Sequence, residues 1–212
     1  MSRTTATRLP EMMSADRADL DALLDRSVLG HFAFADEDGA PVALPSLLVR
    51  WEDQVLTHGS TGSRWLRRIA AGVPVAVSVA TVDGIVVARS AYESSILYCS
   101  AVLFGSFSPL EGADKLAALD VVTERLLPGR TGELRRPSAK ELAATQMLAM
   151  PIGEWSLRLS DGWPEDPDSD VAGPAWAGHI RFGTPPATVA GAPDLRPGIA
   201  VPPSVGRVSG VS

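Results

Sequence analysis

Apolar and polar residues alternate in several short runs of the chain, which is the spacing of half-buried β-strands. The pattern predicts strands over residues 28–35, 41–50, 54–58, 96–107, 154–159 and 175–182. The most apolar run, residues 73–82, is rich in β-branched side chains and too short to cross a bilayer, so it predicts a buried strand. Asp38-Gly39 and Asp83-Gly84 are turn signals, and the second predicts a hairpin that returns over residues 85–88.

Helical spacing interrupts the strands in four places. Ser14 is placed to cap a helix that continues to residue 26, and Gly72 is suited to end a second helix over 63–71. Pro128-Gly129 ends a third helix over 112–127, and Ser138 begins a short one toward Met147. Many short strands with a few inserted helices predict a mainly β protein built as a small barrel.

The two ends of the chain differ from the middle. Residues 1–13 are polar with no apolar signal core, and we expect them to be flexible. Residues 183–212 hold five Gly and six Pro in thirty positions, so they are interpreted as a tail without fixed structure or, alternatively, as an arm ordered over a partner. The expected folded domain is therefore 14–182.

Charge and composition narrow the function. The chain has 19 Lys and Arg against 25 Asp and Glu, a net charge of −6, which argues against a general grip on nucleic acid or on a membrane surface. Cys99 is a single cysteine, and the three histidines are far apart, so no disulfide or zinc-type metal site is expected. From these features we expect the chain to be a cytoplasmic protein.

One segment combines groups that suit an anion. His58-Gly59-Ser60-Thr61-Gly62-Ser63-Arg64 lies between a predicted strand and a predicted helix that also carries Arg67 and Arg68. Glycines let backbone N–H groups turn inward, hydroxyls add donors and Arg64 adds a planar cation. The spacing matches neither a P-loop nor a dinucleotide fingerprint. From the residues alone, a phosphate cradle and a simple helix-capping turn both stay open.

Several motifs occur in one order along the chain. They are the His58–Arg64 segment, T-V-D-G-I-V-V-A-R-S at 81–90, Tyr98-Cys99-Ser100 leading to Phe104-Gly105, Leu127-Pro128-Gly129-Arg130, and Trp176-Ala177-Gly178. In this order they resemble the pyridoxamine 5′-phosphate oxidase-related family of flavin-binding split-barrel proteins, in the flavin-nucleotide-binding or nitroimidazole-resistance-like branch. The resemblance covers roughly residues 8–182.

The resemblance implies a dimeric split β-barrel that holds flavin mononucleotide (FMN) between its subunits and catalyses a redox reaction on a small organic substrate. It assigns the phosphate to His58, Gly59, Ser60, Ser63 and Arg64, and places the strand from Ser46 to Arg50 along the flavin ring. It also matches Ser100 to a serine near the flavin and Trp176 to a tryptophan near the dimer cleft. Arg89, a cation in an apolar strand, is expected either to pair with an acid such as Glu93 or to reach the ligand.

Departures from the family pattern keep alternatives open. Where the family commonly has a histidine, this chain has Glu93 or Ser94. In the N-Y-R-S motif, Leu97 replaces the asparagine and Cys99 replaces the arginine. Near the tryptophan motif, His179 and Arg181 stand where apolar residues are usual. Apolar or acidic replacements near a flavin weaken the stabilisation of a reduced, anionic ring. The alternatives are a deazaflavin coenzyme or haem in the same fold, with His58 or His179 as the haem ligand, and a binding module without turnover. No catalytic acid or base is assigned.

Overall fold

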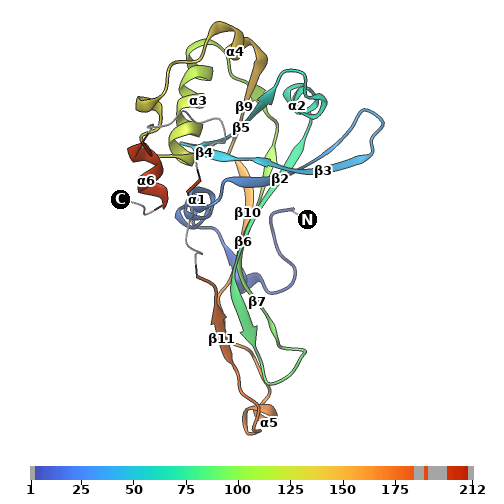
Figure 1. The fold of residues 1–212 in the computed structure, drawn as a ribbon. Coiled ribbons are helices and arrows are strands. Elements are labelled where there is room, and N and C mark those ends of the chain that lie inside the picture. The colour runs from blue at the N-terminus through green and yellow to red at the C-terminus, as the bar shows by residue number, and fades with distance from the viewer. Residues whose placement is uncertain (1–2, 184–188, 191–199, 210–212) are drawn as a thin grey trace.

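The computed structural model describes residues 3–183, 189–190 and 200–209, and folds mainly into antiparallel sheets (Figure 1). The larger sheet has seven strands in the order β1-β10-β7-β6-β2-β3, with β11 also paired to β6, and the smaller has the order β4-β5-β9-β8. The strands are β1 (Met13–Ser14), β2 (Leu29–Ala35), β3 (Pro41–Leu47), β4 (Val49–Trp51), β5 (Gln54–Ser60), β6 (Val75–Val87), β7 (Ser95–Gly105), β8 (Ser108–Pro109), β9 (Thr145–Pro151), β10 (Glu154–Ser160) and β11 (Gly178–Arg181). The mainly β class with inserted helices is confirmed.

Helices fill the gaps between and beside the sheets. The α-helices are α1 (Arg17–Arg26), α2 (Arg64–Ala70), α3 (Gly112–Leu126), α4 (Ala139–Ala144), α5 (Asp168–Val171) and α6 (Pro203–Ser209), with 3-10 turns η1 (Pro10–Met12) and η2 (Thr131–Glu133). No helix in the described part of the chain is both long and apolar enough to span a membrane.

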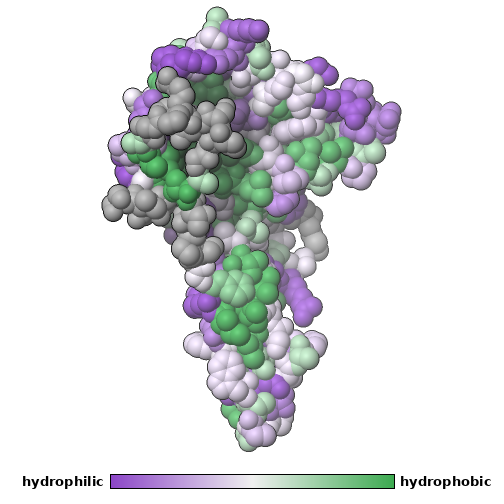
Figure 2. All heavy atoms as spheres, viewed as in Figure 1, coloured by the Kyte–Doolittle hydropathy of each residue, from purple (hydrophilic) through white to green (hydrophobic). Residues whose placement is uncertain are grey.

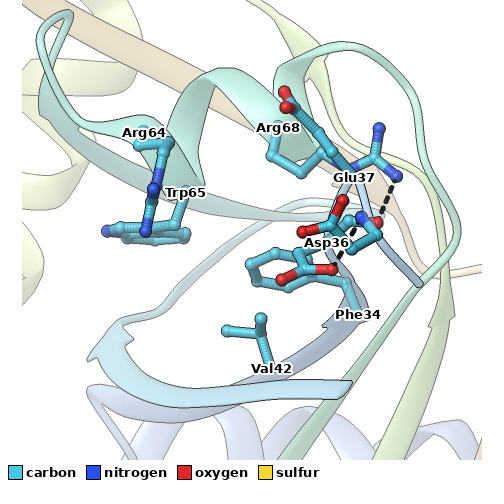
Figure 3. Close-up of a pocket in the computed structure, with 8 residues that line it drawn as sticks. Phe34, Asp36, Glu37, Val42, Arg64, Trp65 and Arg68 are labelled. Carbon is cyan, nitrogen blue, oxygen red and sulfur yellow. Dashed lines mark hydrogen bonds between the residues drawn. The ribbon is translucent and has the colours of Figure 1, made fainter. Parts of the chain in front are cut away.

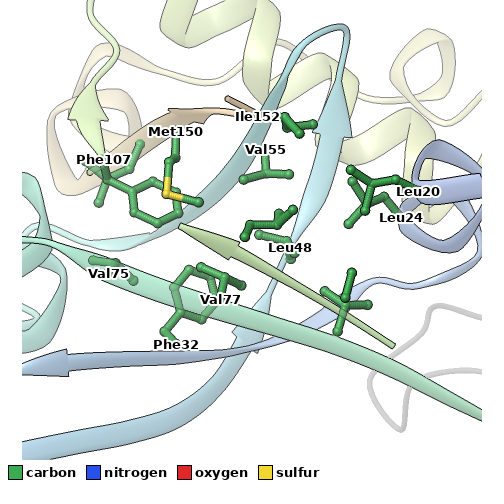
Figure 4. Close-up of a cluster of buried hydrophobic side chains, with 14 of the residues drawn as sticks. Leu20, Leu24, Phe32, Leu48, Val55, Val75, Val77, Phe107, Met150 and Ile152 are labelled. Atoms are coloured by element: carbon green, nitrogen blue, oxygen red, sulfur yellow. The ribbon is translucent and has the colours of Figure 1, made fainter. Parts of the chain in front are cut away.

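The main hydrophobic core lies between the inner faces of the two sheets (Figure 4). Phe32 of β2 is fully buried, and its ring lies 5.5 Å from Trp65 and 5.7 Å from Phe107, measured between centroids. Aliphatic side chains from α1 and α2, including Leu20 and Leu66, close this core. A smaller cluster on the opposite face of the four-stranded sheet packs against α3. We call the part of the molecule that is built around these two clusters the body.

A second region extends away from the body and is here called the arm (residues 82–98 and 161–182; Figure 1). The sequence-based hairpin at Asp83-Gly84 is wrong, because β6 continues through this dipeptide with only a register shift between Val82 and Gly84. Gly84 instead permits a close approach of β11. A Cβ at Gly84 would lie 2.3 Å from the carbonyl oxygen of Ile180.

Polar contacts hold the arm together. The Asp166 side chain is fully buried and accepts hydrogen bonds from the backbone N–H of Arg89 and from Arg89 Nη1 at 3.0 Å. His179 stacks on Trp163 at 3.9 Å between ring centroids, and its Nε2 lies 3.1 Å from the carbonyl oxygen of Gly162. The arm therefore has specific polar anchors but little apolar interior of its own.

Both ends of the chain were predicted to be flexible, and the terminal residues that the structure describes make specific contacts with the rest of the molecule. Near the start, Arg3 pairs with Glu154 and lies 4.3 Å from the centre of the Phe104 ring, while β1 extends the large sheet. Near the end, α6 docks on the body through the fully buried Ser204, whose hydroxyl donates to Glu133. These polar contacts join residues far apart in sequence, which composition alone does not reveal. Residues 1–2, 184–188, 191–199 and 210–212 lie outside the described residues.

Two helix boundaries also differ from the prediction. Asp16, not Ser14, caps α1, because its carboxylate accepts the N–H of Ala18 at 2.8 Å. Ser138 does cap α4 in a reciprocal capping box with Glu141, but the helix ends at Ala144. Thr145 then begins β9, which pairs with β5 along its whole length. A short apolar run does not distinguish helix from buried strand by spacing alone.

Candidate functional site

The loop between β5 and α2 forms the centre of the candidate site. Its turn is fixed from within: the Ser60 hydroxyl accepts the N–H of Gly62 at 3.1 Å, and the Ser60 carbonyl accepts the N–H of Ser63 at 2.9 Å. Thr61 anchors it to the end of α4 by donating its N–H to the Ala144 carbonyl at 3.0 Å. Gly59 leaves room for Leu66, whose Cδ1 would lie 2.6 Å from a Cβ at that position. The loop is thus pre-shaped by its own hydrogen bonds.

Two cavities flank α2. The larger, about 380 Å³, brings together cations and amide or hydroxyl groups from three separate elements. Arg67 of α2, Lys115 of α3 and Gln146 of β9 line it together with Thr61 of the loop and the acidic Glu111. We call it the Arg67 cavity.

The smaller cavity, about 170 Å³, lies at the turn between β2 and β3 (Figure 3). Phe34, Val42 and Trp65 give it apolar walls, with Arg64 and the acidic residues of the turn around them. Arg68 is directed at that turn and donates to the carbonyl oxygens of Ala35 at 3.1 Å and Asp36 at 3.0 Å.

The three arginines of α2 therefore have different roles. From the sequence, Arg64, Arg67 and Arg68 were predicted to form one phosphate cradle. In the structure Arg64 lines the smaller cavity, Arg67 lines the larger one, and Arg68 binds the turn between β2 and β3. Within the described part of the chain, the side chains of Arg64 and Arg67 make no ion pair or hydrogen bond, so both cations remain available to a ligand. Since α2 spans seven residues, these side chains and not its short helix dipole supply the charge.

His58 lies on β5 directly opposite Met147, which lines the Arg67 cavity. The ring is half-buried, and burial lowers its pKa below the ordinary value, so His58 is neutral at pH 7. Its Nδ1 is buried and makes no hydrogen bond within the described structure. A buried imidazole nitrogen without a hydrogen-bond partner is costly, so a ligand group that reached Nδ1 would relieve that cost.

Two other predicted site residues are already paired. Arg50 of β4 makes a two-bond contact with Asp25 of α1, at 2.9 Å from Nε and 2.5 Å from Nη2. This contact raises the pKa of Arg50 and lowers that of Asp25. Arg89 pairs with Asp166 rather than with Glu93. Both guanidinium groups therefore already have a carboxylate partner, and neither lines the two cavities beside α2.

The remaining predicted residues lie on the larger sheet. Ser46 of β3 pairs with Gly30, and Ser100 of β7 pairs with Ala80 and Arg158. Trp176, two residues before β11 begins, is 66% exposed. The single chain therefore brings His58, Ser60, Ser63 and Arg64 together and leaves Ser46, Ser100 and Trp176 apart from them.

Sequence reasoning missed two members of the Arg67 cavity. Gln146 was hidden because its segment was assigned to a helix, and Lys115 because it lies on α3, more than forty residues away in sequence. An isolated amide or lysine on an amphipathic element carries no local signal. The pairing of β5 with β9 brings Gln146 to the loop, and the packing of α3 against the four-stranded sheet brings Lys115 to the same cavity. Within the described ranges, no three His, Cys, Asp or Glu side chains are placed to hold a metal ion.

Comparison with known proteins identifies the family. A family model described as pyridoxamine 5′-phosphate oxidase matches residues 16–159, which is more than half of the chain. The chain belongs to the pyridoxamine 5′-phosphate oxidase family. The predicted resemblance is therefore confirmed. A search of curated proteins gave no significant match.

Two solved structures match over nearly the whole chain. The FAD and heme binding protein from Mycobacterium smegmatis is 48% identical, with 93% of this chain and 97% of that chain covered and a TM-score of 0.89. The flavocytochrome Anf3 from Azotobacter vinelandii is 29% identical, with 98% and 96% covered and a TM-score of 0.90. A putative 5-nitroimidazole antibiotic resistance protein from Bacteroides thetaiotaomicron, 14% identical over 68% of this chain and 84% of that chain, shares the fold at a TM-score of 0.57.

Proposed function

We propose that the protein binds a flavin nucleotide beside the 58–64 loop and acts as a flavin-dependent oxidoreductase on a small organic substrate. The carrying observation is the Arg67 cavity, where Arg67 and Lys115 form no ion pair with any described carboxylate and Thr61 and Gln146 supply hydrogen-bonding groups. Unpaired cations with adjacent donors suit a phosphate or diphosphate. The flavin would supply the redox chemistry, and these residues its position and charge environment.

The cofactor predicted from the sequence was FMN, and we propose FAD as the preferred flavin. The relative that is 48% identical is described as binding FAD. Two cations from different elements also suit a diphosphate better than a single phosphate. A deazaflavin coenzyme stays a prediction.

The test is titration of cofactor-free protein with FAD and with FMN, followed by flavin fluorescence. Arg67→Ala and Lys115→Ala are each expected to weaken FAD binding roughly tenfold or more, because a charge-assisted hydrogen bond is lost. Lys140→Ala removes an exposed cation of α4 outside the cavity and is the matched control. Equal affinity in all three variants would reject the cavity, and no flavin uptake by the wild type would reject the function.

Haem is a second candidate ligand, and it would be bound in addition to the flavin. Of the two relatives that match nearly the whole chain, one is a FAD and heme binding protein and the other is a flavocytochrome. His58 fits a haem ligand, since its ring is neutral and its buried Nδ1 has no partner. His179 fits less well, since its Nε2 already contacts the Gly162 carbonyl and its ring is stacked. Haem titration should give a Soret band that His58→Ala changes and His179→Ala does not.

A dimer is the expected working form. The arm exposes apolar side chains that nothing in the described chain covers, among them Val82 at 52%, Ile180 at 50% and Phe182 at 53% (Figure 2). A patch of this kind on a narrow arm favours a second copy of the chain, in the split-barrel dimer that the family resemblance implies. Light scattering of the purified protein tests this, and Ile180→Asp should shift the mass toward the monomer.

A non-catalytic binding module remains the rival to an enzyme. The two differ in one measurement, the rate at which bound, chemically reduced flavin is reoxidised by candidate substrates under anaerobic conditions. Reoxidation by a substrate faster than by oxygen alone supports the oxidoreductase. Rates that never exceed the oxygen rate support storage or sensing.

A further inference from the structure

The smaller cavity, at the turn between β2 and β3, has no role in the function proposed above. Three elements supply its apolar walls: Phe34 of β2 is buried, Val42 of β3 is half-buried, and Trp65 of α2 also packs against Phe32 in the core. Figure 3 shows Trp65 and Phe34 lining the space from different sides, above Val42. A cavity of about 170 Å³ with two aromatic walls suits one planar ring system, such as a nucleobase.

The acidic turn beside these walls is held in one conformation. Asp36 Oδ1 accepts the backbone N–H groups of Asp38 at 3.0 Å and of Ala40 at 2.9 Å, which orients the carboxylate. Arg68 reaches the turn from α2 and donates to the carbonyl oxygen of Asp36 at 3.0 Å. The second carboxylate oxygen of Asp36, Oδ2, has no hydrogen-bond partner within the described structure. It is therefore an oriented acceptor that is free to bind a donor of a ligand.

The charges around the cavity exclude several classes of ligand. Asp36, Glu37 and Asp38 would repel a phosphate or a carboxylate, and Arg64 would repel an organic cation. Within the described ranges, no group of three acidic or other ligating side chains is placed to hold a metal ion. An uncharged ring with an exocyclic amine fits both kinds of wall. Its faces pack against the aromatic side chains, and its amine donates to a carboxylate.

The helix α2 connects this cavity to the Arg67 cavity. Arg64 lines the smaller cavity and Arg67 lines the larger one. Residues three apart in a helix are neighbours on its surface, with about 5–6 Å between their Cβ atoms. A ligand whose phosphates lie at Arg67 can therefore continue past Arg64, through one ribose, into the smaller cavity. The acidic turn then contacts the uncharged end of the ligand and not its phosphates.

We propose that the smaller cavity binds the aminopurine base of a nucleotide, with Trp65 and Phe34 packing against the ring and Asp36 accepting a hydrogen bond from the exocyclic amine. This inference rests on the proposed function in so far as the adenine of FAD is one source of such a base. A separate purine nucleotide is the other source. FMN has no such base, so in the first case this cavity distinguishes FAD from FMN.

The first test needs no flavin. Calorimetric titration of cofactor-free protein compares ADP with purine riboside 5′-diphosphate, which lacks the exocyclic amine. The wild type should bind ADP roughly tenfold more tightly, because only ADP donates to the carboxylate. Asp36→Asn should abolish this preference, since asparagine keeps the acceptor that the turn needs and replaces the free acceptor with a donor. Asp168→Asn removes an exposed carboxylate of α5 outside both cavities and should keep the preference.

The second test distinguishes the two sources of the base. FAD and FMN affinities are measured for Asp36→Asn and for Val42→Trp, whose larger side chain fills the cavity. If the base belongs to FAD, the ratio of FAD affinity to FMN affinity should fall roughly tenfold in both variants, and an unchanged FMN affinity shows that they are folded. If the ratio is constant while ADP binds beside bound flavin and is lost in Val42→Trp, the base belongs to a separate nucleotide.

Failure of this inference differs from failure of the proposed function. If the wild type takes up no flavin but prefers ADP and loses that preference in Asp36→Asn, the proposed function fails and the base site stands. Flavin uptake by a wild type that binds both diphosphates equally well overturns the base site alone. The base site is also overturned if Asp36→Asn and Asp168→Asn show the same preference. The same holds if neither diphosphate binds and both variants leave the FAD to FMN ratio unchanged.

Discussion

The body and the arm of this chain are stabilised by different kinds of contact. In the body, fully buried aliphatic and aromatic side chains from both sheets and from α1 and α2 form one continuous core. In the arm, strands β6, β7 and β11 expose much of their apolar surface, and a few polar contacts fix their arrangement. The comparison predicts that the body is the more stable part of the chain and that the arm, which has little apolar burial of its own, is the less stable part.

The largest expected effect comes from the core of the body. Phe32→Ala should lower the free energy of unfolding by about 3–5 kcal/mol, because it leaves a cavity between Trp65 and Phe107. Urea denaturation followed by fluorescence measures it. Phe182→Ala is the counterpart on the arm, and its side chain is 53% exposed, so a loss of the same size there would contradict the distinction.

Next is the buried carboxylate of the arm. Asp166→Asn should destabilise the arm locally by about 2–3 kcal/mol, because Arg89 is left partly buried without its charge partner. Hydrogen exchange should rise at the ends of β6 and β11 while the body stays protected. Asp161→Asn breaks an exposed pair with Arg181 and should change little. Cooperative unfolding of the whole chain in Asp166→Asn would instead mean that arm and body form one unit.

The close approach of β11 gives a smaller effect. In Gly84→Ala the new Cβ meets backbone atoms, the Ile180 carbonyl oxygen and the Arg181 Cα, so the strands must separate. We expect a loss of about 1–3 kcal/mol, confined to the arm. Limited proteolysis near β11 detects it. Gly153→Ala, which has no atoms within 4 Å of the added Cβ, is the control, and equal proteolysis of both variants would reject the role of Gly84.

The smallest effect depends on pH and concerns the body. Burial lowers the pKa of His58, so below about pH 6.5 the unfolded chain binds a proton at this position before the folded chain does. The stability of the wild type should therefore fall, relative to His58→Gln, as the pH decreases through this window, by less than about 1.4 kcal/mol per pH unit. Thermal unfolding between pH 5 and 8 measures the difference. The exposed His31→Gln serves as the control.

The sequence predicted the body better than the arm, and the reason is the range of the interactions. Gly72 ends α2 with a positive φ of 79°, as local turn chemistry requires. Gly84 carries the same kind of local signal, yet its role is set by a strand almost one hundred residues later. A pattern of neighbouring residues predicts local conformation, but it does not predict which segment far away in the sequence will pack against the backbone.

The candidate site divides in the same way. The 58–64 loop was identified because its donors are contiguous in sequence. Lys115 and Gln146 of the same cavity were missed because three elements had to be assembled first. The resemblance placed Arg50 along the flavin, and the sequence left Arg89 open between an acid and the ligand. Their carboxylate partners in the structure, Asp25 and Asp166, are distant in sequence and could not be paired with them by inspection.

The short strand β11 has a further consequence for solubility. It pairs with residues 84–87 of β6, along the edge that β2, paired with residues 76–78, does not reach. Without β11, this edge would present unpaired N–H and C=O groups beside exposed apolar side chains, which is a template for strand addition between molecules. A chain cut between α5 and β11 would retain the intact core of the body and still be prone to aggregate.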